Sequence, residues 1–191
     1  MILASNNKRK LKEIKEILTD YELKTLEEFG IDVDVVEDQN TFYGNALKKA
    51  TEIYDLVKEE VIADDSGLCI DVLGGWPGVI THRFLGENTT ARERNLAIIE
   101  KLKDVPSEKR TANVVCNLVY HNGNDTVLGE GILNGRVPLE PRGTNGFGFD
   151  EIFMLEDGRT LAELSSEEKN VMSARYLAAI DLRNKLKILR K

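Results

Sequence analysis

Two kinds of strand connection are encoded in this sequence, and together they restrict the fold. In the first half, short apolar runs alternate with segments whose apolar residues recur at helical spacing. In the second half, Asn122-Gly123 separates the strand-like run Val114 to Tyr120 from another that begins at Val127, which is a hairpin signal. Strand-helix-strand units give parallel neighbours, whereas a hairpin gives antiparallel ones. The sequence therefore predicts an α/β fold with a central mixed sheet flanked by helices.

The first half is expected to hold three strands. Residues 1–4 form an apolar run, and apolar side chains then recur at positions 11, 14, 17 and 18, as in a helix. Ile31 to Val35 alternate with polar residues and are expected to form the second strand. Thr41 is the expected N-cap of the next helix. That helix leads to a third strand, which begins at Val61 and is expected to end at Asp64-Asp65.

The second half adds a helix that contains Leu96 and is stopped before Pro106, and a short strand from Ile152 to Met154. Ser165 and Glu168 have the spacing of a capping box that would open the last helix. No repeat or long linker interrupts the chain. We therefore expect a single domain over residues 1–191, arranged as two lobes with an active-site cleft between them.

Composition excludes several classes of protein. The formal net charge is −7 and the pI is about 5.1, which disfavours a nucleic-acid-binding protein. No apolar stretch is long enough to span a membrane or to act as a signal peptide. Cys69 and Cys116 lie in apolar runs without metal-ligand spacing, as reduced core residues do. These features predict a soluble, cytoplasmic protein.

A basic segment follows the first strand. Ser5 to Lys10 reads SNNKRK, at the point where the strand gives way to a helix. Exposed backbone N–H groups, the positive end of the helix dipole and three basic side chains would suit a phosphate chain. The glycines and the Gly-Lys-Ser/Thr ending of a Walker loop are missing. The alternative is an N-capped helix with a solvated basic turn.

Acidic residues follow two of the expected strands. Glu37 comes after the second strand, and Asp64 and Asp65 come at the end of the third. If these ends lie at one edge of the sheet, their oxygens could hold Mg²⁺, which binds few carboxylates and keeps water for substrate phosphate. The alternative is that Asp65 or Ser66 caps a turn. Basic and acidic groups at one edge would suit metal-assisted attack on a phosphate.

Two later segments could contact a ligand. Arg142 to Asp150 reads RGTNGFGFD, where Phe147 could stack on a base and Asp150 could accept hydrogen bonds from its edge. Lys169 and Arg175 stand near the start of the final helix. The alternatives are a glycine-rich turn with a core phenylalanine, and a solvated helix surface.

In order along the chain, these segments resemble the inosine triphosphate pyrophosphatase family, which hydrolyses non-standard purine nucleoside triphosphates. The matching stretches are SNNKRK, EDQNTFYGNALKKA (37–50), ADDSGLCIDVLGGWPGV (63–79), GFGFD (146–150) and EEKNVMSAR (167–175). The resemblance implies an elongated two-lobed fold, a homodimer, and Mg²⁺-dependent cleavage of ITP, dITP or XTP to the monophosphate and pyrophosphate.

The resemblance also implies roles for individual residues. Glu37 and Asp65 would hold the metal, and Asp65 would orient or deprotonate the attacking water, with Asp64 and Ser66 in support. Lys10 and Lys49 would act on the reacting phosphates. The phosphate-binding residues would be Ser5, Asn7, Lys10, Lys49 and Ser66. The base-binding residues would be Phe147, Gly148, Phe149, Asp150, Lys169 and Arg175.

Two positions depart from the family pattern. The family usually has Ser-His-Arg where this chain has Ser173-Ala174-Arg175, and often Ser-Ala-Arg where it has Thr81-His82-Arg83. One hypothesis is that His82 takes the space or role of the missing histidine; the alternative is that His82 is a surface residue. Two other functions stay open: a Maf-like pyrophosphatase acting on pyrimidine nucleotides, and a non-catalytic nucleotide-binding protein.

Overall fold

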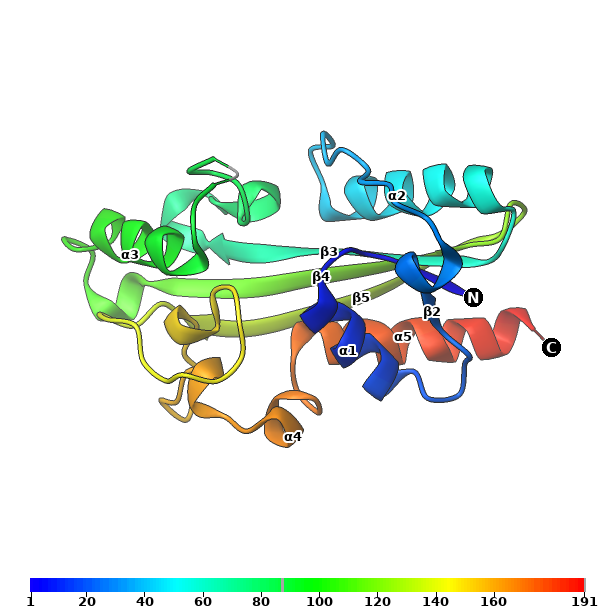
Figure 1. The fold of residues 1–191 in the computed structure, drawn as a ribbon. Coiled ribbons are helices and arrows are strands. Elements are labelled where there is room, and N and C mark those ends of the chain that lie inside the picture. Colours follow the sequence, from blue (N-terminus) through cyan, green and yellow to red (C-terminus); the bar gives the residue numbers. More distant parts are fainter. Residues whose placement is uncertain (87, 191) are drawn as a thin grey trace. The chain divides into compact units, whose positions relative to one another are not determined.

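The structure is a computed structural model that describes residues 1–86 and 88–190, and its strands form a five-stranded sheet (Figure 1). The strands are β1 (Ile2–Ala4), β2 (Lys24–Thr25), β3 (Val61–Ile70), β4 (Thr111–His121) and β5 (Thr126–Arg136). Their order is β2-β1-β3-β4-β5, and β1 pairs in parallel with both β2 and β3. The neighbours β4 and β5 are joined by residues 122–125 alone, so they run antiparallel. The predicted mixed sheet of an α/β fold is confirmed.

The α-helices are α1 (Lys8–Ile17), α2 (Phe42–Val57), α3 (Ala91–Lys101), α4 (Ser166–Lys169) and α5 (Ala174–Leu189). Thr41 caps α2 as predicted, because its hydroxyl accepts from the N–H of Gly44 at 2.9 Å. Thr90 and Glu93 form a capping box at the start of α3. Within the described residues, no helix combines the length and apolar character that crossing a membrane requires.

The chain divides into two compact units. Unit 1 is Met1–Ser66, Cys116–Gly131 and Ser173–Lys191, and unit 2 is Gly67–Val115 and Ile132–Met172. In unit 1, α2 lies on one face of the sheet and α1 and α5 lie on the other (Figure 1). Ala46, Ala50 and Ile53 of α2 pack against Ile2 and Val61 of the sheet. The single domain and the cleft between lobes stay predictions.

The predicted strand from Ile31 to Val35 is wrong, since these residues form no strand. Their alternation has another cause: Ile31, Val33 and Val35 pack against the core of unit 1, and the residues between them are exposed. Period-two burial therefore arises here without strand pairing.

The predicted end of the third strand is also wrong, because β3 continues through Asp64 and Asp65 to Ile70. In unit 2, residues 150–152 form a 3-10 turn instead of the start of a strand, and Met154 makes only isolated bridges with Arg136 and Thr160. The capping box of Ser165 and Glu168 is present, but it opens the one-turn helix α4. Ser173 caps the last helix, α5.

Candidate active site

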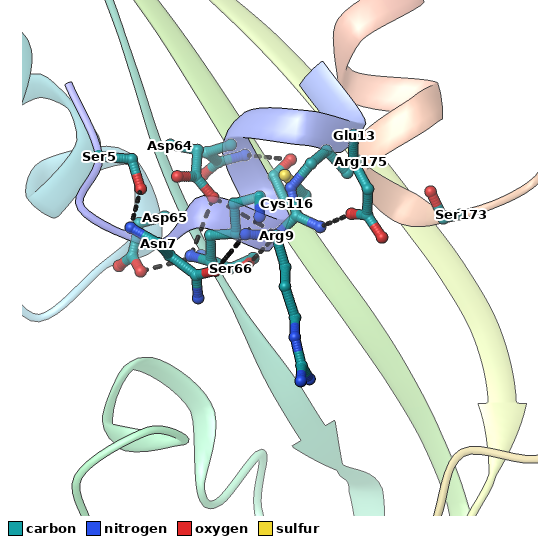
Figure 2. Close-up of polar contacts among 12 residues, drawn as sticks. Ser5, Asn7, Arg9, Glu13, Asp64, Asp65, Ser66, Cys116, Ser173 and Arg175 are labelled. Carbon is teal, nitrogen blue, oxygen red and sulfur yellow. Dashed lines mark hydrogen bonds and ion pairs between the residues drawn. The ribbon is translucent and has the colours of Figure 1, made fainter. Parts of the chain in front are cut away.

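The interior of β3 carries a buried acidic side chain, Asp64, held by two cations (Figure 2). The Nζ of Lys10 lies 2.9 Å from Asp64 Oδ2, and Nη2 of Arg175 lies 3.5 Å from the same oxygen. All three residues are less than a tenth exposed. Burial by itself would raise the pKa of Asp64, but the charges of Lys10, Arg175 and Lys49 outweigh it and hold the pKa well below its ordinary value.

Arg175 reaches this cluster from the first turn of α5. Ser173 caps the helix by accepting from the N–H of Tyr176 at 3.1 Å. The guanidinium donates to Glu13 Oε2 at 2.5 Å and to Ser66 Oγ at 3.2 Å, as Figure 2 shows. Burial lowers the pKa of Arg175, but the surrounding Cys116, Asp64 and Glu13 raise it by more than burial lowers it. The pKa is therefore above its ordinary value, and the guanidinium stays charged. Arg175 therefore joins α1, β3 and α5.

Lys49 enters the same region from α2. Its Nζ donates to Glu37 Oε1 at 2.6 Å and to the backbone carbonyl of Asp64. Burial lowers the pKa of Lys49, but Asp64, Glu37 and Asp65 more than offset this, so its pKa is raised. The carboxylates therefore keep this partly buried amine protonated.

Asp65 lies next along β3 and is almost fully buried. Asn45 Nδ2 donates to its Oδ2 at 2.9 Å, and the N–H of Ser66 donates to its Oδ1 at 2.9 Å. Burial raises the pKa of Asp65 to about 6, with a further increase from Glu37 and a partial offset from Lys49. A carboxylate that titrates near neutral pH is suited to accept a proton from water.

Glu37 and Asp65 fit a divalent cation. Among residues 1–86 and 88–190, no three His, Cys, Asp or Glu side chains are arranged to hold a metal. Mg²⁺ needs only one or two carboxylates when substrate phosphate and water complete its shell. Burial is the main cause of the raised pKa of Asp65, and a dication would relieve the repulsion from Glu37 that adds to it. This pair could therefore hold a metal together with a substrate phosphate.

Ser5 and Asn7 form the turn into α1. The N–H of Asn7 donates to Ser5 Oγ at 3.2 Å, and Asn7 Oδ1 accepts from the N–H groups of Arg9 and Lys10 at 3.1 and 3.2 Å. Asn7 is thus an N-cap, as the alternative interpretation of SNNKRK requires. The same turn carries Lys10 to Asp64, so the segment also contributes to the buried cluster.

A second polar group lies in unit 2, where the turn at Phe147 is wound around Asp150. Asp150 Oδ2 accepts from the N–H of Phe147 at 2.8 Å and from Lys169 Nζ at 2.7 Å. That ammonium lies 4.5 Å from the centroid of the Phe147 ring. Asp150 and Lys169 are both buried. The turn therefore presents an aromatic ring beside a fixed ion pair.

The structure groups the predicted site residues by unit. Unit 1 holds Ser5, Asn7, Lys10, Glu37, Lys49, Asp65, Ser66 and Arg175, and unit 2 holds Phe147, Gly148, Phe149, Asp150 and Lys169. Arg175, predicted with the base-binding set, contacts Asp64 and Ser66 of unit 1. The roles of all these residues stay predictions.

Three neighbours of the site were not predicted from the sequence. Asn45 lies one helical turn before Lys49, and Glu13 lies one turn after Lys10, so helical spacing could have found both. Cys116 is buried among the charges of this cluster, and burial raises the pKa of its thiol to about 12. The core role predicted for Cys116 is therefore confirmed.

His82 belongs to unit 2, where its ring stacks on Phe149 with centroids 6.3 Å apart and planes 21° apart. It is half-buried rather than a freely exposed surface residue. Ala174, at the position of the missing family histidine, is buried in unit 1. Whether His82 replaces that histidine stays a prediction.

These groups define an α/β protein whose sheet carries a buried cluster of carboxylates with lysine and arginine. The model of the Ham1 family matches residues 1–185. The chain belongs to the Ham1 family.

Similar proteins cover nearly the whole chain. A protein of Caldanaerobacter subterraneus named dITP/XTP pyrophosphatase is 44% identical over 187 residues, covering 96% of this chain and 94% of the relative. One of Bacillus subtilis with the same name is 43% identical over 178 residues, covering 91% and 90%. The solved structure of a HAM1 protein from Coxiella burnetii matches with a TM-score of 0.88 and 37% identity, covering 98% of each chain.

Proposed function

We propose that this protein hydrolyses non-standard purine nucleoside triphosphates, ITP, dITP and XTP, to the monophosphate and pyrophosphate, and so removes them from the nucleotide pool. The proposal is supported by the relatives named dITP/XTP pyrophosphatase. The structural observation that carries it is Asp65, a buried carboxylate with a pKa of about 6 beside Glu37 and Lys49. A purely base-binding protein would have no use for this group.

The proposed reaction is attack of water on phosphorus with pyrophosphate as the leaving group. Asp65 accepts a proton from the water as its oxygen bonds to the α-phosphorus, and the bond from that phosphorus to the bridging oxygen of the β-phosphate breaks. A divalent metal held by Glu37 and Asp65 would offset charge on the triphosphate. Lys10 and Lys49 bind phosphate oxygens and stabilise the charge that develops on them.

The phosphate-binding set also includes Ser5, Asn7 and Ser66. Bringing a phosphate chain to Lys49 would replace its bond to Glu37, because both anions compete for one ammonium. Glu37 would then be released to hold the metal. In this way Lys49 would bind the phosphate chain and Glu37 would be available to a metal.

Base recognition is assigned to Phe147, Gly148, Phe149, Asp150, Lys169 and Arg175. Phe147 would stack on the purine, and the polar side chains would contact its edge. Because Ala174 has no polar side chain, discrimination among bases would lose a contact that a histidine could supply. A lost neutral hydrogen bond is worth about 0.5–1.5 kcal/mol, which would broaden specificity without abolishing turnover.

Mg²⁺ is the proposed metal because it accepts few carboxylates and retains water. A homodimer is proposed from the family resemblance, and a cytoplasmic location from the composition of the sequence, with the nucleotide as substrate and no nucleic-acid or membrane partner.

Product analysis tests the reaction. The protein is incubated separately with ITP, XTP, dUTP and GTP in the presence of Mg²⁺, and the phosphate product is identified. Pyrophosphate from ITP and XTP is the expected result. Preference for dUTP would favour a pyrimidine pyrophosphatase, and release of orthophosphate would contradict the cleavage position.

Asp65→Asn separates catalysis from binding. This variant is expected to lose turnover while ITP binding, measured by calorimetry, remains detectable. Nucleotide binding without turnover by the unmodified protein would instead favour a non-catalytic binding protein. Full activity of Asp65→Asn would remove Asp65 from the mechanism.

A further inference from the structure

Asn95 is a buried amide on α3 that bonds to the segment on either side of Phe149. It is only 3% exposed. Its Nδ2 donates to the backbone carbonyl of Gly148 at 2.9 Å and to Glu151 Oε1 at 2.9 Å. A single amide therefore holds the loop both before and after Phe149 and Asp150.

The inner side of this loop depends on Asp150. Its carboxylate accepts from the N–H of Phe147 and from Lys169 Nζ, and the N–H of Asp150 donates to the carbonyl of Phe147 at 3.2 Å. These bonds close the turn and attach it to the one-turn helix α4, which ends at Lys169. Asn95 supplies a second attachment, to α3, which is an eleven-residue helix with a capping box.

Glu151 strengthens the attachment on the outer side. Its Oε2 accepts from Arg92 Nη1 at 2.7 Å, while its Oε1 accepts from Asn95. The side chain of Arg92 is 57% exposed, so solvent screens its ion pair with Glu151. Asn95 is buried, and removal of its amide would leave the Gly148 carbonyl without this donor.

We propose that Asn95 is a positioning residue for base recognition: it fixes the loop of residues 146–151 from α3 and so sets the orientation of Phe147 and Asp150. The proposal rests on the function proposed above. Asn95 acts through the loop and does not itself touch the substrate. Its loss is expected to weaken contacts to the base, while phosphate binding in unit 1 stays unchanged.

Asn95→Asp is the main test, because it keeps the size of the side chain, removes both donated bonds and places a carboxylate against Glu151. The KM for ITP is expected to rise about tenfold, as for the loss of one or two buried hydrogen bonds, with kcat changed less than twofold. The ratio of kcat/KM for ITP over GTP is expected to fall. The inhibition constant of tripolyphosphate, which has no base, is expected to stay within twofold.

Arg92→Gln is the matched control, since it removes the other partner of Glu151 and leaves Asn95 in place; its KM is expected within twofold of the unmodified protein. Asn95→Ser serves if Asn95→Asp does not fold. Hydrogen exchange of the segment 146–151 is measured in parallel and is expected to accelerate in the Asn95 variants alone.

The two proposals can fail separately. If the unmodified protein releases no pyrophosphate, the proposed function fails, and faster exchange of the loop still tests whether Asn95 holds it. If pyrophosphate is released but KM, base preference and exchange are unchanged in Asn95→Asp, Asn95 is not a positioning residue. An equal rise in the KM for ITP and in the inhibition constant of tripolyphosphate would also overturn the proposal, because it would indicate a general structural defect.

Discussion

Lys10 and Asp64 form a buried ion pair in which Nζ and Oδ2 are 2.9 Å apart and the side chains are 8% and 1% exposed. Arg175 shares the same carboxylate oxygen. Desolvating these charges is costly, so the cluster is expected to be stable only while its charges balance. One acidic side chain on β3 thus fixes a predicted phosphate-binding residue on α1 and the first turn of α5.

Asp64→Asn is expected to destabilise the protein at pH 7 by about 3 kcal/mol, because it leaves two buried cations without their shared counter-charge. Chemical denaturation measures the change. The pKa of Asp64 is below its ordinary value of 3.8 in the folded protein, so its contribution is present above that pH and is lost as pH falls toward the folded value. The difference in free energy of unfolding between Asp64→Asn and the unmodified protein should therefore become smaller only in strong acid.

The control for this prediction is Asp34→Asn, which removes an exposed carboxylate outside any helix or strand. Asp34→Asn is expected to change the free energy of unfolding by no more than about 0.5 kcal/mol. Equal stability of Asp64→Asn and the unmodified protein at pH 7 would mean that the cluster balances its charge without Asp64.

In the proposed mechanism Lys49 is a preorganised cation at the reacting phosphates, so Lys49→Met is expected to lower kcat for ITP by about 100- to 1000-fold. The Lys49 charge also lowers the pKa of Asp65, so its removal should move the acid limb of the pH profile upward. Steady-state kinetics from pH 5 to pH 9 measures both effects.

Lys48→Met provides the comparison on the same helix. Lys48 Nζ donates instead to the carbonyl of Val36 and to Asp38 Oδ1, each at 2.9 Å. The kcat of Lys48→Met for ITP is expected to stay within twofold of that of the unmodified protein. If both variants behave alike, the effect belongs to the net charge of α2 and not to the position of Lys49.

Local patterns predicted the parts of this fold that short segments determine. Thr41 caps α2 and Asn122-Gly123 lies between paired strands, because turn and cap chemistry depends on residues close in sequence. Helical spacing alone did not assign Lys49 to the site; that came from the family resemblance. The alternation of Ile31, Val33 and Val35 predicted a strand that does not form, since alternation does not reveal whether a neighbouring strand is available for pairing.

The length of β3 could not be predicted locally. Two adjacent aspartates indicated the end of a buried strand, because unpaired carboxylates are costly to desolvate. The side chains that solve this problem are distant in sequence: Arg175 is 111 residues from Asp64. The residues near VIADDSG in the sequence do not reveal this contact. The contact of Arg175 with Ser66 could not be predicted for the same reason, since these residues are 109 positions apart.

The carboxyl group of Asp65 is expected to titrate near pH 6 in metal-free protein, because burial raises its pKa to about 6. Carbon-13 NMR of the labelled carboxyl group measures the midpoint. Asn45→Ala should raise it by about 0.5–1 pH unit through loss of one hydrogen bond, and Glu37→Gln should lower it by removing a repulsive charge. Shifts in the same direction for both variants would contradict this electrostatic account.

The raised pKa also predicts a gain in stability for Asp65→Asn. Between the ordinary value of 3.8 and about 6, the folded protein binds the Asp65 proton more tightly than the unfolded chain does. Stability contributed by this group is therefore lost as pH rises through that interval. Metal-free Asp65→Asn is expected to be more stable than the unmodified protein at pH 7 by about 1–2 kcal/mol, and similarly stable at pH 4, by chemical denaturation. Lower stability at pH 7 would show that the Asn45 bond matters more than the charge.

Gly146 tests the geometry of the turn around Asp150. It has a φ of +72°, and a Cβ there would lie 2.1 Å from Asp150 Oδ2, so Gly146→Ala must displace the carboxylate that holds Phe147 and Lys169. Gly158→Ala is the matched control, because its φ is +87° and nothing lies within 4 Å of the added Cβ. The control should show only the cost of left-handed backbone, about 1–2 kcal/mol, whereas Gly146→Ala should exceed it and also raise the KM for ITP at least tenfold. Equal stability and KM in the two variants would mean that the Asp150 carboxylate does not need its observed position.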